Sequence, residues 1–243
     1  MRNVAVVMIV GLVCGSAASA RGQCPAAPSF RAPDWAADFD GRRTPNEAEA
    51  RARVARLEAE VTATPQNAPS QAEQLRQLAE AQRDVYRATG ARSALEASIR
   101  RFAQTVRDHP NMPHMDRVLF LLAWGLDELE QPQRAREIYF RLIRRFPTSP
   151  YVALGYLRFA EHYWAEGDFR AAQQFFQHVV AMEAGIHSAY AAYMAAWSAH
   201  RLGDASEARG SAAGARRVLT SIAHPSAQSL REALDRDACA IAP

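Results

Sequence analysis

The amino-acid sequence predicts an all-α protein built as a solenoid of helix-turn-helix repeats, and three observations lead to this fold class. First, apolar residues recur at three- and four-residue steps along most of the chain, as on one face of an α-helix. Second, small residues at Ala135, Ala172 and Ala208 repeat at spacings of 37 and then 36 residues, and such a fixed period is typical of helical arrays. Third, Gly-Asp pairs at 167–168 and 203–204 supply a helix stop and the cap of the following helix.

Residues 1–20 have the order of a secretory signal peptide. Arg2 gives one positive charge, an apolar run covers residues 4–13, and a small-x-small cleavage motif ends the segment. A retained membrane anchor is the alternative, but the second half of the segment is small and only weakly apolar. We therefore expect an exported chain that begins at Arg21 and carries no membrane span after cleavage.

Two cysteines remain after the leader, Cys24 and Cys239, one near each end of the mature chain. Lipid modification of Cys24 is not expected, because Gln23 and Arg21 stand where such sites need a small and an aliphatic residue. An oxidising compartment allows a Cys24–Cys239 disulfide. The sequence leaves open whether the two sulfurs meet.

Residues 21–43 form a Pro-rich lead-in in which no helical period survives the prolines. Its aromatic residues are Phe30, Trp35 and Phe39. The segment is either flexible or an extended strip that lies against the solenoid, and we expect the flexible form.

Residues 44–110 predict three helices, which span about 44–61, 71–88 and 93–107. Thr44 serves as the predicted cap of the first, with Glu47 completing a capping box. The last two form a degenerate repeat, since Phe102 stands 37 residues before Tyr139.

Residues 111–220 read three times as a helix, a short turn and a second helix, and residues 221–243 form a terminal capping helix over about 226–238. The spacing, the small residues, the Gly-Asp turns and Pro147 together resemble the tetratricopeptide repeat family. The units are slightly longer than the family's usual length of about 34 residues, and the third is unusually alanine-rich. The resemblance implies a right-handed superhelical solenoid.

The Phe-Pro-x-Ser-Pro linker at residues 146–150 is similar to the bacterial envelope branch of the family. That branch includes the outer-membrane assembly lipoprotein BamD and the Tol-Pal-associated cell-division coordinator. In the family, the first helix of each pair lines a concave groove, where large aromatics anchor partners. Carried over to this sequence, the groove comprises Phe120, Trp124, Asp127, Glu128, Leu157, Arg158, Glu161, Trp164, Tyr190, Tyr193, Trp197, His200 and Arg201. Several of these side chains would instead be core if the helices are buried on more than one face.

The resemblance implies a non-enzymatic scaffold of the Gram-negative cell envelope, in the periplasm or at the outer-membrane periphery, that holds a protein or peptide in its groove. The main alternative is a structural adaptor that uses its convex face or its N-terminal tail, with the groove filled by its own chain. The strip Phe30, Trp35 and Phe39 distinguishes the two, because its presence in the groove argues against free peptide binding.

Other chemistry is weakly indicated. All 29 basic residues are arginine, the net charge is only +3, and acidic residues are interspersed, so no basic face for nucleic acid is expected. No phosphate-binding loop, zinc motif or nucleophile elbow appears, which predicts neither enzyme activity nor a cofactor. The cluster His109–Met115 carries imidazole and thioether groups that suit copper. Its other interpretation, an inter-repeat linker, is preferred.

Overall fold

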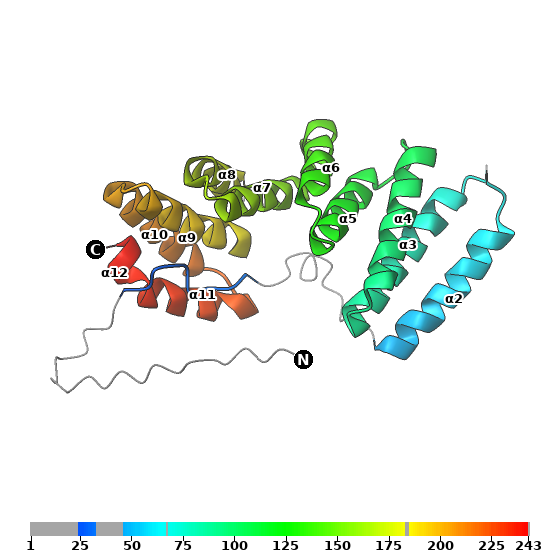
Figure 1. The fold of residues 1–243 in the computed structure, drawn as a ribbon, viewed down its shortest axis with the longest axis horizontal. Helices are drawn as coiled ribbons and strands as arrows, with labels where there is room; N and C mark the ends of the chain where they lie inside the picture. Colours follow the sequence, from blue (N-terminus) through cyan, green and yellow to red (C-terminus); the bar gives the residue numbers. More distant parts are fainter. Residues whose placement is uncertain (1–23, 33–45, 67, 183–184, 243) are drawn as a thin grey trace, which may run out of the picture.

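The computed structural model describes residues 24–32, 46–66, 68–182 and 185–242. These residues form eleven helices and no strand, and successive helices pack on one another in chain order (Figure 1). The helices are α2 (Glu47–Ala63), α3 (Gln71–Thr89), α4 (Arg92–Asp108), α5 (Met115–Glu128), α6 (Pro132–Arg145), α7 (Val152–Glu166), α8 (Phe169–Met182), α9 (Ile186–Arg201), α10 (Ala205–Leu219), α11 (Pro225–Arg236) and α12 (Ala238–Ile241). The predicted all-α solenoid is confirmed.

The three repeats are the pairs α5–α6, α7–α8 and α9–α10. The small residues Ala135, Ala172 and Ala208 are fully buried, as close packing of two helix backbones requires. Gly167 and Gly203 adopt the left-handed conformation predicted for the helix stops, with φ of 80° and 78°. In the first repeat Glu130 takes this conformation without being glycine, with φ of 60°.

The pair α3–α4 follows the same packing plan. The Ser98 hydroxyl donates a hydrogen bond of 2.7 Å to the carbonyl oxygen of Ala79, which places two small residues at the closest helix contact. Phe102, Tyr139 and Phe176, spaced 37 residues apart, are all 0% exposed. The same structural position therefore recurs in three successive helix pairs, α3–α4, α5–α6 and α7–α8.

The start of α2 differs from the prediction. The helix begins at Glu47, and its capping box consists of Asn46 and Glu49 rather than Thr44 and Glu47. The Asn46 side chain accepts from the Glu49 amide at 2.9 Å, and the Glu49 carboxylate accepts from the Asn46 amide at 3.3 Å. Asparagine is as good a cap as threonine, so two overlapping cap patterns competed in the sequence.

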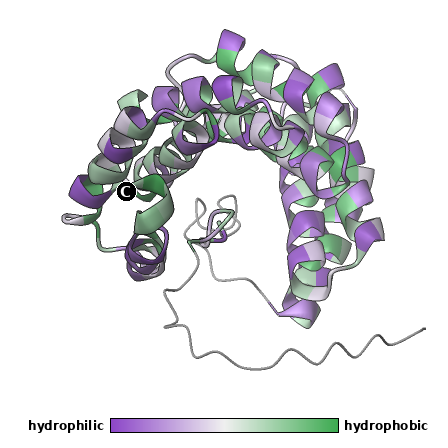
Figure 2. Cartoon of the chain, turned by 60° about the vertical axis from the view of Figure 1, so that its left-hand side comes forward, coloured by the Kyte–Doolittle hydropathy of each residue, from purple (hydrophilic) through white to green (hydrophobic). Residues whose placement is uncertain are grey.

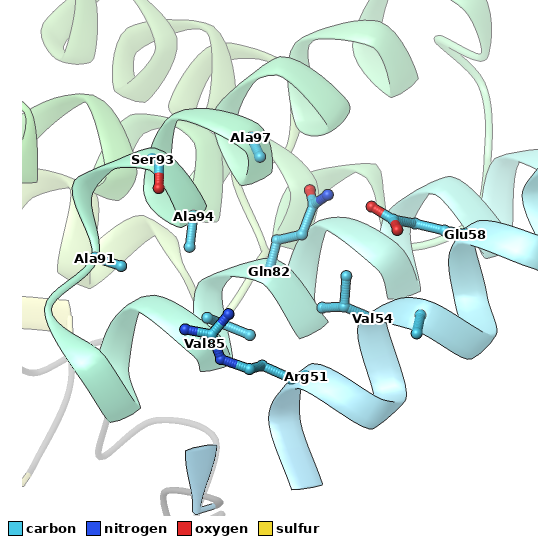
Figure 3. Close-up of a pocket in the computed structure, with 10 residues that line it drawn as sticks. Arg51, Val54, Glu58, Gln82, Val85, Ala91, Ser93, Ala94 and Ala97 are labelled. Atoms are coloured by element: carbon cyan, nitrogen blue, oxygen red, sulfur yellow. The ribbon is translucent and has the colours of Figure 1, made fainter. Parts of the chain in front are cut away.

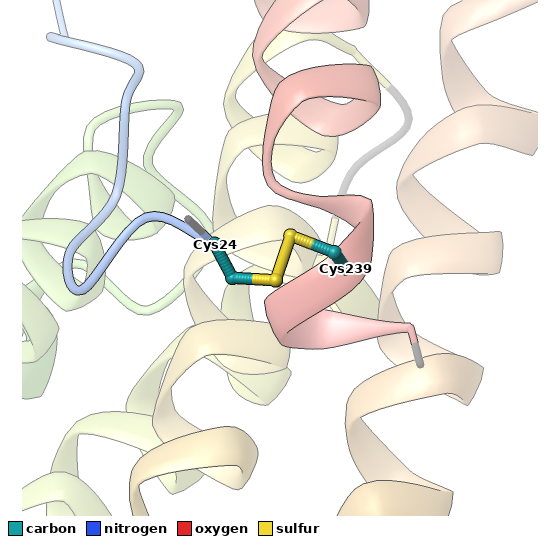
Figure 4. Close-up of a disulfide and its surroundings, with 2 residues drawn as sticks. All are labelled: Cys24 and Cys239. Carbon is teal, nitrogen blue, oxygen red and sulfur yellow. A yellow bond between two sulfur atoms is a disulfide. The ribbon is translucent and has the colours of Figure 1, made fainter. Parts of the chain in front are cut away.

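The segment 24–32 lies beside α11 and α12, at the opposite end of the chain (Figure 1). Cys24 and Cys239 form a disulfide with a Cα–Cα distance of 5.7 Å (Figure 4). The helices curve into an arc, and this segment lies on its inner side (Figure 2). The predicted signal peptide and the residues Trp35 and Phe39 lie outside the described residues. In the part that is described, no helix combines the length and the apolar character needed to cross a membrane.

Candidate interaction surfaces

Most of the large side chains predicted to line the groove are part of the core. The first helix of each repeat packs against its own partner helix and against a neighbouring pair, so it is enclosed on several sides. In this structure these side chains are covered by neighbouring helices or, for Tyr190 and Tyr193, by Phe30 of the N-terminal segment, so they are not exposed to a partner. Their exposed fractions are between 0% and 5%, and they are Phe120, Trp124, Leu157, Tyr190, Tyr193 and Trp197.

The charged residues of the predicted groove bind one another across repeats. Asp127 on α5 accepts hydrogen bonds from the Tyr139 hydroxyl at 3.2 Å, from Arg158 Nε at 3.1 Å and from His162 Nε2 at 2.9 Å. Arg158 also pairs with Glu161 at 2.6 Å. Burial, with the negative charge of Asp127, raises the pKa of Tyr139 well above its usual value, so the phenol stays a neutral donor. These groups therefore hold adjacent repeats together.

Three predicted groove residues are exposed, Glu128, His200 and Arg201, and Trp164 is half-buried. Glu128 accepts a hydrogen bond of 3.0 Å from the hydroxyl of Tyr86. Trp164 and Arg201 both contact the ring of Phe169, at 4.9 Å between ring centroids and at 5.5 Å from the guanidinium carbon. They form a small mixed patch where α7, α8 and α9 come together.

The chain itself covers the aromatic residues of the third repeat. Phe30 packs its ring against Tyr190 and Tyr193, with centroid distances of 5.7 Å and 6.3 Å, and is only 9% exposed. Its amide donates to the Tyr193 hydroxyl at 3.2 Å. The neighbouring Ser29 amide donates to Asp237 Oδ2 at 3.0 Å. The described part of the N-terminal strip thus lies on the predicted groove.

Asp237, between α11 and α12, is buried at the centre of these contacts and was not predicted from the sequence. Its Oδ2 atom also accepts from the Tyr193 hydroxyl at 2.5 Å and from Trp197 Nε1 at 3.0 Å. Burial and the hydrogen bond to Asp237 raise the pKa of Tyr193 well above its usual value. In the sequence, Asp237 is marked only by its position two residues before Cys239. That position places it near residues 24–32 because Cys239 is bonded to Cys24.

The cluster His109–Met115 does not converge on a common point. Met115 belongs to the core, Met112 packs against it, and His109 Nε2 lies 3.1 Å from the Gln71 side-chain oxygen. No group of three or more metal-ligating His, Cys, Asp or Glu residues occurs in the described ranges. The cluster behaves as the linker between α4 and α5.

Two further features lie outside the predicted groove. A hollow of about 350 Å³ opens between α2, α3 and α4, with Val54, Val85 and Ala97 in its wall and Glu58 at its edge (Figure 3). On α6, Phe140 is 55% exposed, the most of any large apolar side chain among those described. The Arg144 guanidinium lies 5.6 Å from its ring centre.

The geometry defines a helical-repeat protein whose elements stack in one dimension. Residues 117–149, which cover the first repeat, match the family model described as the tetratricopeptide repeat. The match supports the family resemblance for the repeat formed by α5 and α6.

Among solved structures, the chain is similar to YrrB, described as a TPR protein with an unusual peptide-binding site. The alignment has 16% identity and a TM-score of 0.47, and it covers 82% of this chain and 98% of that one. No curated protein sequence matches the chain.

Proposed function

We propose that this protein is an exported, non-enzymatic scaffold of the bacterial cell envelope that acts as a structural adaptor through the outer surface of its solenoid. One observation carries the choice: residues 24–32 occupy the third repeat, where Phe30 packs on Tyr190 and Tyr193. A groove already filled by its own chain offers less room to a free peptide. The disulfide supports an oxidising compartment, and the Phe-Pro-x-Ser-Pro linker supports the envelope branch of the family.

The outer face of α6 is the surface best suited to a partner. Phe140 provides an exposed aromatic anchor, and Arg141 and Arg144 flank it on the same helix. Figure 1 shows α6 protruding at the top of the array. An aromatic residue with adjoining arginines is the composition enriched at protein interfaces. A protein partner with an acidic rim around an apolar pocket fits this face.

Peptide binding in the remaining groove is the second candidate. It is favoured by the patch of Trp164, Phe169 and Arg201, which is accessible and combines two aromatic rings with a guanidinium.

The two candidates are separated by affinity capture from envelope extract with the full chain and two double variants. Phe140→Ala/Arg141→Ala changes the outer face, and His200→Ala/Arg201→Ala changes exposed positions of the groove. Both variants alter exposed side chains, so matched helical content by circular dichroism is expected. The adaptor proposal expects a protein retained by the parent and by the groove variant but lost by the α6 variant. A protein lost only by the groove variant would show that the partner binds in the groove instead.

A further inference from the structure

We propose that α9, together with Asp237, forms a binding site for a peptide segment, and that residues 24–32 are its tethered ligand. This inference goes beyond the adaptor function and does not depend on which surface the envelope partner uses. It rests on how the segment is held, on an unused acceptor in the site, and on the covalent connection between the two.

The site recognises the segment mainly through its backbone. Two consecutive amides, those of Ser29 and Phe30, donate to Asp237 Oδ2 and to the Tyr193 hydroxyl at 3.0 Å and 3.2 Å. The Tyr193 hydroxyl donates a hydrogen bond of 2.5 Å to the same carboxylate, so both acceptors are held in place. Backbone recognition of this kind accepts many sequences.

One side chain of the ligand is selected. The Phe30 ring enters the space beside Tyr190 and Tyr193, and it is buried in the main core cluster. The preceding Ser29 hydroxyl is contacted only at 3.4 Å, by Arg236 Nε. The site therefore requires an aromatic residue directly after the first bound amide, and is permissive at the residue before it.

The tethered segment leaves part of the site unsatisfied. Asp237 is 0% exposed, yet its Oδ1 atom has no hydrogen-bond partner among the described residues. Buried carboxylate oxygens are normally paired, so an unpaired one indicates a position that a better ligand fills. A segment that brings one more donor to this oxygen would bind more tightly than residues 24–32 do.

The disulfide explains why a weaker ligand holds the site. Cys24 and Cys239 lie within a few residues of Ser29 and Asp237, so the bond keeps the segment beside the site. A short tether gives an effective concentration on the order of millimolar. An external peptide therefore competes only poorly until that tether is removed.

The test uses the full chain and a fluorescent probe, a blocked peptide of residues 24–32 with serine at the cysteine position. A second peptide has alanine at the phenylalanine position. The proteins are the parent, Cys24→Ser/Cys239→Ser, and that variant with Phe30→Ala added. Fluorescence anisotropy is expected to show negligible binding to the parent and clear binding to the triple variant. The alanine peptide is expected to bind at least about tenfold more weakly.

Equal binding of the two peptides would overturn the proposal, as would no binding by a triple variant whose circular dichroism matches the parent. If Phe30→Ala prevents folding, hydrogen exchange in Cys24→Ser/Cys239→Ser decides. Saturating probe peptide is then expected to speed exchange at the Ser29 and Phe30 amides, because it displaces the segment. Unchanged protection would mean that the segment is a fixed structural part. The capture experiment on α6 can fail or succeed without affecting either result.

Discussion

At the scale of single residues, Glu80 is the most connected charge of the N-terminal half. It is almost fully buried on α3 and binds Arg117 of α5 at 2.8 Å, together with Arg76 of its own helix. The Arg117 guanidinium also donates a hydrogen bond of 3.0 Å to the hydroxyl of Tyr151, the residue before α7. This chain of contacts joins three successive repeats. Removing its central carboxylate takes the Glu80 counter-charge from the largely buried Arg117 and leaves Arg76 paired with Glu73.

Glu80→Gln is expected to reduce the free energy of unfolding at pH 7 by about 3 kcal/mol. Burial alone would raise the pKa of Glu80, but Arg117 and Arg76 lower it below its usual value. A carboxyl whose pKa is lowered on folding contributes stability above its unfolded pKa, and loses it as the pH falls through the folded value. The difference between parent and variant should therefore shrink below about pH 4.

Urea denaturation at pH 7 and at pH 3 measures this difference. Glu47→Gln is the matched control, since Glu47 pairs with Arg51 on the exposed face of α2 at 2.8 Å. The control should change stability by no more than about 0.5 kcal/mol. A Glu80 effect that is equal at both pH values would contradict the assignment.

At the scale of elements, the glycines within helices have opposite roles. A Cβ atom on Gly125 of α5 would lie 2.9 Å from Ile99 Cγ1 of α4, which is too close for two buried atoms. A Cβ atom on Gly210 of α10 would meet nothing within 4 Å. The first glycine is needed for helix packing, whereas the packing of the second does not require glycine.

Gly125→Ala is expected to destabilise the protein by about 1–3 kcal/mol, because the added methyl group overpacks the α4–α5 contact. Gly210→Ala is expected to stabilise it by up to about 1 kcal/mol through helix propensity. Thermal unfolding of the two variants beside the parent tests both signs. A shift of the same sign for both would show that propensity, not the close approach, dominates at Gly125.

At the scale of the whole molecule, the two ends of the solenoid are closed differently. The C-terminal end carries α11, α12 and the disulfide, which spans 215 residues of sequence. At the N-terminal end of the array, α2 packs on α3 through a small apolar cluster around Leu57 and Leu78. In a one-dimensional array, stability is set by local interfaces, so each closure affects mainly its own end.

Cys24→Ser/Cys239→Ser is therefore expected to weaken the C-terminal end by about 2–4 kcal/mol. Hydrogen exchange followed by mass spectrometry should show faster exchange in α11 and α9 and unchanged exchange in α3. Mass mapping of the parent under non-reducing conditions checks that the bond is present. Faster exchange along the entire chain would show instead that the solenoid unfolds as one unit.

The sequence by itself determined the helices, their order and the repeat, because these depend on local periodicity, caps and glycine stops. The pairs around Ala135, Ala172 and Ala208 formed as predicted, and the helices expected at 71–88 and 93–107 were observed as Gln71–Thr89 and Arg92–Asp108. The four-residue helix α12 was missed, since so short an element carries no periodic signal. The N-terminal cap of α2 was predicted at Thr44 but lies at Asn46, because both residues fit a capping box.

Only the tertiary structure decided which faces are available to a partner. Aromatic spacing marks a helix face, but not whether another part of the chain covers it. Tyr193 is covered both by Phe30 of the N-terminal segment and by Asp237, which lies between α11 and α12. The contact between Ser29 and Asp237 joins residues 208 apart in sequence, and nothing local in either segment indicates it. Repeats are encoded within about 37 residues, whereas surfaces are decided by contacts between distant segments.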